Sequence, residues 1–313
     1  MKYITNVMKN ILDFKTLMEF TDYFKDEATC VAHFTATRFR NGEYCPHCHT
    51  TKIYKCAGGK RYHCASCKQD FTIRTKTVFG ESKLPLRKWY MAVYLLSTTS
   101  KGISSLQLAK HVGVTQKTAW FMDHRLRSAM KQDGGQIFGT IEADETYVGG
   151  AARNMHEWAK KKSGIGTGGK GKAIVFGMKQ RDGQVRARLI TSNGSEQLHP
   201  AISATVAPGS VLYTDEHRGY NGLEGYSRTV VNHSVKEWVN GMAHTNGIES
   251  FWALFKRGYH GVYHWMSRKH LQKYIDEAAY RLNRRGQGMN MVFGEVVERT
   301  TDGQKLPYKK LIE

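Results

Sequence analysis

The chain has 313 residues and a formal net charge of +20 at pH 7, because 47 lysines and arginines outnumber 27 aspartates and glutamates. Such a surface attracts polyanions, since neutralising phosphates releases counterions, so we expect nucleic acid as the partner, with a merely soluble basic protein as the alternative. No apolar run approaches the ~20 residues of a membrane-spanning helix, and the N-terminus lacks a signal-peptide pattern, which argues against a membrane or secreted protein.

The first part of the chain predicts helices followed by a small metal-binding module. Apolar residues recur at helical spacing over residues 10–39. Two CxxC pairs follow, separated by fifteen residues, which is the spacing of a four-thiolate zinc ribbon. We therefore expect one structural Zn²⁺ bound by Cys45, Cys48, Cys64 and Cys67. Thiols without metal, or a redox pair, are the alternatives.

Residues 86–130 have helical periodicity with a break at Gly113, which predicts a helix-turn-helix unit. Gly113 permits the turn, and Thr115 can cap the second helix. We expect this second helix to expose residue types that reach DNA bases or phosphates, namely Gln116, Lys117, His124, Arg125 and Arg127. A helix-turn-helix that serves only as a packing element is the alternative.

Beyond a linker at residues 133–135, strands and helices follow in an order that predicts an α/β domain with a mixed sheet. Asp182 and Gly183 predict the turn of a β-hairpin. A glycine- and lysine-rich loop separates the first strand from this hairpin. The expected strands cover 137–148, 172–180, 184–192 and 210–215, and the expected helices cover 196–204, 246–257 and 267–285.

Three acidic residues indicate a metal-dependent phosphoryl-transfer site. Asp144 lies on the first long strand, Asp215 ends a later strand, and Glu249 lies on the helix expected over 246–257. Alternation along the first strand puts Asp144 on one face and Glu145 on the other, and either face could hold the metal. Such carboxylates suit a pair of Mg²⁺ ions, because hard cations take oxygen ligands and a metal pair clamps both oxygens of a phosphoryl displacement.

Several stretches of the chain resemble a known family, namely CPHC…YHCASCKQDF, LPLRKWYMAVYLL, DETYVGG, YTDEHRGY, HTNGIESFWALFKRGYHGVYH and KHLQKYIDEAAYRLNRR. They look like the DDE transposases of bacterial insertion sequences, in the group with an N-terminal zinc ribbon and an RNase H-like (ISXO2-like) catalytic domain. The resemblance implies that Asp144, Asp215 and Glu249 bind the metal ions, and that Lys256 is the basic residue seven positions after the glutamate. It also places Asn246 in the cleft, because some relatives are thought to use asparagine in place of the glutamate.

The motifs divide the chain into five expected parts. These are an N-terminal helical segment (1–40), a zinc ribbon (41–80), a helix-turn-helix DNA-binding segment (81–133), an RNase H-like DDE catalytic domain (134–290) and a C-terminal tail (291–313). The expected DNA-binding residues are Gln116, Lys117, Arg125, Arg127, Lys160, Lys161, Lys162, Asn246 and Arg257.

The resemblance implies a transposase that binds terminal inverted repeats, frees a 3′-hydroxyl with two Mg²⁺ ions or Mn²⁺ in their place, and joins it to target DNA. Its partner would be double-stranded DNA, held by a homo-oligomer of at least two chains in the bacterial cytoplasm, associated with the nucleoid and not with a membrane. Two other interpretations stay open. A sequence-specific DNA-binding regulator would need no carboxylate triad, and an RNase H-like nuclease would cut DNA without joining strands.

Overall fold

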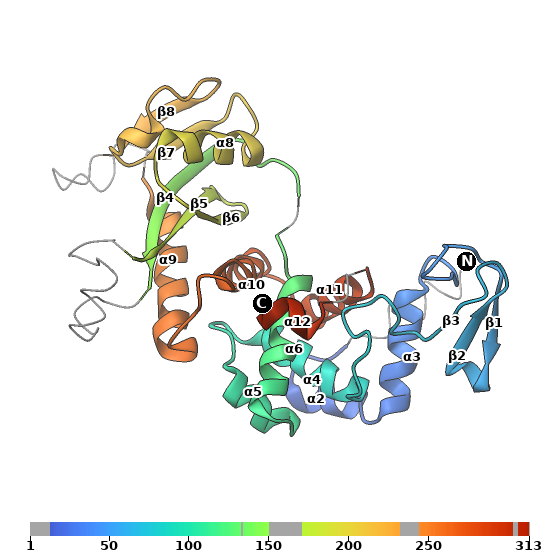
Figure 1. Cartoon of the computed structure of the whole chain (residues 1–313). Helices are drawn as coiled ribbons and strands as arrows, with labels where there is room; N and C mark the ends of the chain where they lie inside the picture. Colours follow the sequence, from blue (N-terminus) through green and yellow to red (C-terminus); the bar gives the residue numbers. More distant parts are fainter. Residues whose placement is uncertain (1–12, 133, 150–170, 232–243, 303–305, 313) are drawn as a thin grey trace. The chain divides into compact units, whose positions relative to one another are not determined.

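A computed structural model of the chain (Figure 1) describes residues 13–132, 134–149, 171–231, 244–302 and 306–312. The chain forms two compact units. The first contains residues up to 130 together with 286–313, and the second contains residues 131–285. The chain therefore leaves the first unit, builds the second and returns. The end of the chain, expected as a tail, contributes helices α11 (Met289–Asp302) and α12 (Tyr308–Ile312) to the first unit.

An aromatic core holds the helices of the first unit together. It joins α2 (Leu17–Tyr23), α4 (Leu86–Thr98) and α11, and His33 of α3 (Glu27–Arg38) packs edge to face on Phe24 and Tyr90. Its rings lie 4.9–6.3 Å apart between centroids, mostly edge to face, and belong to Phe14, Phe20, Phe24, Tyr90 and Phe293. Because aromatic side chains bury large apolar areas and prefer such geometry, this cluster stabilises the unit strongly for its size.

The zinc-ribbon segment forms a three-stranded antiparallel sheet in the order β1-β2-β3. The strands are β1 (Ile53–Cys56), β2 (Arg61–Cys64) and β3 (Asp70–Phe71), with the short helix η1 (Ala57–Gly59) between the first two. Tyr62 and Phe71 stack across β2 and β3, with ring centroids 5.2 Å apart. The predicted ribbon is confirmed as a strand module around the two CxxC turns.

The predicted helix-turn-helix is present as α5 (Ser105–Val112) and α6 (Gln116–Ala129). Gly113 between them is left-handed, with φ 62°, which only glycine adopts without strain. Thr115 caps α6 by accepting a hydrogen bond from the backbone N–H of Thr118.

The second half of α6, however, is buried. His124, Arg125 and Arg127 are each at most 2% exposed, so the expectation that these side chains face DNA is wrong. The guanidinium of Arg125 donates to the carbonyl oxygen of Gly80 at 2.6 Å and lies 4.9 Å from the ring centroid of Phe121. Helix α6 packs against α4, α5 and α11, and sequence spacing alone does not reveal which of its residues these neighbours bury.

We predict that Arg125→Ala lowers the free energy of unfolding by about 2–3 kcal/mol, because it removes a charge-assisted hydrogen bond and cation–π contacts from a buried place. Lys110→Ala, which removes the same charge from an exposed position of α5, should stay within about 0.5 kcal/mol of the parent. Urea denaturation followed by circular dichroism measures both, and an Arg125 variant as stable as the Lys110 variant would contradict the burial argument.

The second unit is built on a five-stranded mixed sheet in the order β6-β5-β4-β7-β8. β4 pairs antiparallel with β5 and parallel with β7, β5 and β6 form the predicted hairpin, and β7 and β8 are parallel. The bounds are β4 (Thr140–Val148), β5 (Ala173–Gln180), β6 (Val185–Ile190), β7 (Val211–Thr214) and β8 (Ser227–Val230). The sequence analysis missed β8, because this short edge strand has no alternation of apolar and polar residues.

Helices cover both faces of this sheet (Figure 1). One apolar layer joins the sheet to α8 (Ser195–Thr205), and the other joins it to α9 (Asn246–Gly258) and α10 (Leu271–Asn283). Short helices η3 (Arg218–Tyr220) and η5 (Tyr259–Tyr263, a π-helix) follow β7 and α9. This architecture confirms the predicted α/β fold with a mixed sheet. No helix in the described part of the chain is long and apolar enough to cross a membrane.

Candidate active site

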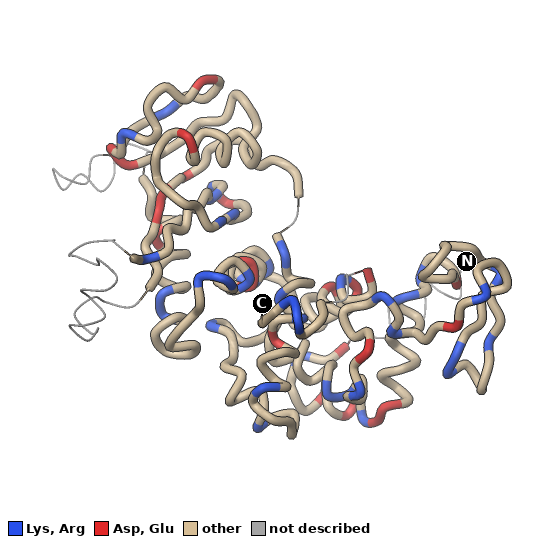
Figure 2. The backbone as a smooth tube through the Cα atoms, viewed as in Figure 1, with Lys and Arg blue, Asp and Glu red and all other residues tan. Residues whose placement is uncertain are grey.

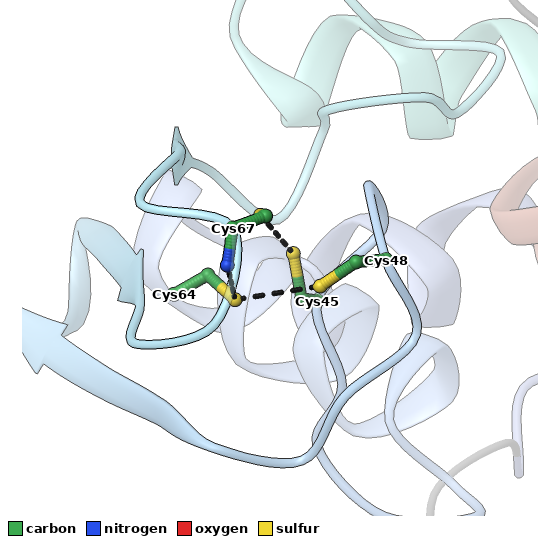
Figure 3. Close-up of side chains that lie close together, drawn as sticks. All are labelled: Cys45, Cys48, Cys64 and Cys67. Carbon is green, nitrogen blue, oxygen red and sulfur yellow. Dashed lines mark hydrogen bonds between the residues drawn. The ribbon is translucent and has the colours of Figure 1, made fainter.

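Within the described residues, two groups of side chains could hold a metal ion, and the first is the thiol cluster of the ribbon (Figure 3). The sulfurs of Cys45 and Cys67 are 3.7 Å apart, and those of Cys48 and Cys64 are 3.5 Å apart. A tetrahedral ion with Zn–S bonds of about 2.3 Å requires sulfurs about 3.8 Å apart. The backbone N–H groups of His47 and Cys67 donate to Cys45 and Cys64, as suits thiolates. The cluster therefore fits a structural Zn²⁺.

The second group brings together carboxylate oxygens of Asp144, Glu145 and Asp215, all within 4.8 Å of one another. The cause is the parallel pairing of β4 with β7, which sets Glu142 beside Tyr213. The same register, continued by two residues, brings Asp144 beside Asp215. Two of the three predicted carboxylates thus meet at one place, and Glu145 joins them.

The electrostatics of the cluster reflect its crowding. Burial, together with the charges of Asp215 and Glu249, raises the pKa of Asp144 to about 6, although a hydrogen bond from Trp252 opposes the rise. Burial, together with the charges of Asp215 and Asp144, raises the pKa of Glu145 to about 8, although a hydrogen bond from Tyr220 opposes the rise. Ionising these carboxylates together is costly, and a divalent cation bound among them stabilises the ionised state.

Glu249 lies outside this tight cluster, on the first turns of α9. Its Oε1 accepts a hydrogen bond from the hydroxyl of Thr245 at 2.8 Å. Its charge still contributes to the raised pKa of Asp144, so the two carboxylates are near enough to interact electrostatically. Lys256, two turns further along α9, is exposed.

Helix α9 is fastened directly to β4, the strand that carries Asp144. The indole Nε1–H of Trp252 donates to Oδ2 of Asp144 at 3.0 Å. One turn earlier, the backbone N–H of Ile248 donates to Oε2 of Glu142, a buried carboxylate near the positive end of the helix dipole. These two bonds fix how α9 presents its side chains to the carboxylates of β4.

Two glycines make this close approach possible. Gly177 on β5 pairs with Asp144, and a β-carbon there would lie 2.5 Å from the Trp252 ring. A β-carbon on Gly247 would lie 2.7 Å from Oε2 of Glu142. Any larger residue at either position must displace the helix or the carboxylate.

The loop that carries Asp215 is held by neighbouring groups. The backbone N–H of His217 donates to Oδ1 of Asp215 at 3.0 Å. Arg228 on β8 donates through Nη2 to the carbonyl oxygen of Asp215 at 3.0 Å and through Nε to the hydroxyl of Thr214 at 2.9 Å. The edge strand β8 therefore supports the loop after β7.

The structure places the remaining predicted residues as follows. Gln116, Lys117, Asn246 and Arg257 are exposed, whereas Lys160, Lys161 and Lys162 lie outside the described residues. Gln116 and Lys117 begin α6, so the exposed part of the helix-turn-helix is its N-terminal turn.

Sequence reasoning missed three residues that shape the site. Glu145, whose Oε1 accepts a hydrogen bond from Tyr220, shares a strand face with apolar residues, and a carboxylate on such a face needs a partner, which was a usable signal. Trp252 gave no signal of a role beside the carboxylates, because an aromatic residue on an amphipathic helix ordinarily packs in the core. Arg228 gave no signal, because its partners are the hydroxyl of Thr214, the amide oxygen of Asn221 and two backbone oxygens of a loop, and no local spacing relates them to it.

We predict that the protein contains one Zn²⁺ per chain and that Cys64→Ser loses it, because three thiolates leave the tetrahedral site open. Cys56→Ser should keep the metal, since Cys56 lies outside the cluster. Elemental analysis of both purified variants provides the measurement, and zinc retained at full stoichiometry by Cys64→Ser would refute the assignment.

We further predict that Gly177→Ala destabilises the second unit by about 1–3 kcal/mol, because the added methyl overlaps the Trp252 ring. In a Trp252→Phe background, which lacks the overlapping indole atoms, the same glycine change should cost less. A double-mutant cycle of unfolding free energies tests this. An equal cost in both backgrounds would show that the contact does not limit the approach of α9.

Comparison with known proteins agrees with this geometry. Residues 136–283 match the family model of the ISXO2-like transposase domain, and residues 25–70 match that of the transposase zinc-ribbon domain. The chain is 30% identical over 233 residues to an uncharacterized protein in transposable element ISH50 of Halobacterium salinarum, covering 70% of this chain and 79% of that one.

A second similarity is to an uncharacterized transposase-like protein of Haemophilus influenzae, at 32% identity over 91 residues, which covers 28% of this chain and 72% of the relative. The carboxylates of β4 and β7 lie inside the matched transposase domain, and the four cysteines lie inside the matched ribbon. The chain therefore belongs to the family of ISXO2-like transposases with an N-terminal zinc ribbon.

Proposed function

We propose that this transposase binds the ends of its insertion sequence as double-stranded DNA and catalyses metal-dependent strand cleavage followed by strand transfer. The observation that carries the proposal is the convergence of Asp144 on β4 with Asp215, directly after the neighbouring parallel strand β7, in a transposase domain. The net charge of +20 supports DNA as the partner. The chain would act as a homo-oligomer, at least a dimer on DNA, on the nucleoid in the bacterial cytoplasm.

Asp144 and Asp215 would hold two Mg²⁺ ions, or Mn²⁺ in their place, together with a third carboxylate. Bound there, the ions would activate water for attack on phosphorus and stabilise the leaving 3′-oxygen, and the freed 3′-hydroxyl would later attack a phosphodiester of the target. Trp252 would keep one oxygen of Asp144 in place by its hydrogen bond. Lys256 would hold a nearby phosphate as a point charge.

For the third carboxylate we propose Glu249 rather than Glu145. Glu145 already accepts a hydrogen bond from the hydroxyl of Tyr220, which occupies its Oε1. Glu249 lies on α9, and its charge acts on Asp144. Asn246 is the first residue of α9, follows the N-cap Thr245 and is exposed, so a role in DNA contact suits it better than metal binding.

DNA recognition would be shared by basic and polar residues of both units. Gln116 and Lys117 at the start of α6 would contact base edges, because the N-terminal residues of a recognition helix reach into the major groove. Arg257 and the lysines at 160–162 would contact phosphates. Changes at Gln116 should therefore relax sequence preference, while changes at Arg257 should weaken binding to all sequences alike.

We predict that Asp144→Asn and Asp215→Asn abolish Mg²⁺-dependent cleavage of element ends but leave DNA binding largely intact, because each removes a metal ligand without adding bulk. Glu249→Gln should lose cleavage by several orders of magnitude. Glu145→Gln should retain most of it, and Asn246→Ala should lose little activity and stay within about 0.5 kcal/mol in stability. Mapping of 3′ ends and joined products, with binding followed by fluorescence anisotropy, gives each quantity.

The outcomes separate the competing functions. Cleavage without joined products would favour an RNase H-like nuclease, and specific binding without any nicking would favour a regulator. Normal cleavage by Asp144→Asn would overturn the metal assignment. An inactive Glu145→Gln beside an active Glu249→Gln would exchange the roles of the two glutamates.

A further inference from the structure

The connection between α9 and α10 presents a tryptophan to solvent. Trp265 is 70% exposed, although it lies only two residues after the π-helix η5 that continues α9. Burial of a tryptophan side chain is strongly favourable, so an indole that stays exposed does not gain this stabilisation.

The backbone at this point is strained. His264 has φ 58° and ψ −31°, and the backbone N–H of Trp265 donates to the carbonyl oxygen of Tyr263 at 2.6 Å. This is close to the geometry of a γ-turn with a positive central φ, a rare turn that persists only where the surroundings impose it. The chain reverses sharply at His264, and the side chain that follows, that of Trp265, is exposed to solvent.

Both ends of the turn are anchored in the second unit. The hydroxyl of Tyr263 donates to Oε1 of the buried Glu277 at 2.8 Å, and its ring packs edge to face on Tyr274 with centroids 4.9 Å apart. Met266, directly after the tryptophan, is 7% exposed and belongs to the apolar layer under α10. The packed flanks maintain the strained turn, so the backbone position from which Trp265 projects is fixed.

The surrounding segment is strongly basic. Residues 250–275 contain no aspartate or glutamate, and Figure 2 shows the Lys and Arg positions at the end of α9 and along the connection to α10. The basic residues are Lys256, Arg257, Arg268, Lys269 and Lys273, of which the first four are exposed. A fixed aromatic face in a cationic, acid-free segment matches how proteins hold nucleic-acid strands, by stacking on bases while cations track the backbone.

We propose that Trp265 is a stacking platform for an unpaired base of the DNA strand that the active site handles, with Arg268 and Lys269 contacting the adjoining phosphates. The inference rests on the proposed function, because α9 carries both Glu249 and, through η5, this turn. A base that leaves the duplex exposes its π-face, which the exposed indole can cover, whereas a fully paired duplex offers no such face.

The test uses the full-length Asp144→Asn protein without added Mg²⁺, so that no strand is cut. Three duplexes are compared: one with a single extrahelical 2-aminopurine, one with an abasic nucleotide at that place, and one fully paired. We expect the parent to quench the 2-aminopurine and to prefer that duplex over the abasic one. Trp265→Ala should lose the quenching and bind the 2-aminopurine duplex about 5- to 150-fold more weakly, with little change on the abasic duplex.

Two control variants separate stacking from charge. Trp265→Phe keeps an aromatic face and should retain most of the preference, whereas Lys269→Gln should weaken binding to all three duplexes alike. Circular dichroism checks that each variant is folded. A Trp265→Ala protein that still prefers the unpaired base overturns the proposal. So does a Trp265→Ala protein that differs from the parent only in the mass of its assembly, measured by sedimentation, because Trp265 would then be a contact between copies of the chain.

The readout also keeps this inference apart from the catalytic proposal. The preference for the unpaired base is measured by binding and requires no cleavage, so the test can be carried out even if the metal assignment is wrong. If cleavage follows the carboxylates but no preference for the unpaired base exists, only the stacking role is refuted. If Asp144→Asn cleaves normally while the preference depends on Trp265, only the metal assignment is refuted.

Discussion

The candidate site depends on keeping mutually repelling carboxylates together in a half-buried place. Oxygens of Asp144, Glu145 and Asp215 lie within 4.8 Å of one another, and burial with mutual repulsion raises the pKa of Asp144 to about 6. Without a cation this arrangement opposes folding, because each charge loses water and meets another charge. The surrounding packing must therefore provide the stability that the site itself does not.

That packing is concentrated where α9 lies on the sheet. The parallel register of β4 and β7 aligns the two aspartates, and the absent side chain of Gly177 lets Trp252 approach Asp144. The N–H of Ile248 bonded to Glu142 sets the start of the same helix. Because the helix that bears Glu249 touches the strand that bears Asp144, one structural contact links stability to the geometry proposed for catalysis.

In the first unit, tertiary packing reduces the number of residues that the proposed DNA-reading helix α6 can present to DNA. The basic side chains in the second half of α6 are used internally, as when Arg125 bonds to Gly80 and stacks on aromatic rings. Its N-terminal turn, with Gln116 and Lys117, stays exposed. The residues available for recognition are thus fewer than the charge of the helix indicates, and they lie where recognition helices ordinarily meet base edges.

Local spacing alone determined much of this protein: the CxxC pairs of the ribbon, the hairpin turn at Asp182 and Gly183, and the strand positions of Asp144 and Asp215. Spacing suffices there because metal ligands, turns and strand faces obey short periods along the chain. Only the tertiary structure decided that β8 completes the sheet, that Glu145 joins the carboxylates and that Arg125 is buried. Those features depend on which surfaces meet after folding, and residues far apart in the sequence supply the surfaces.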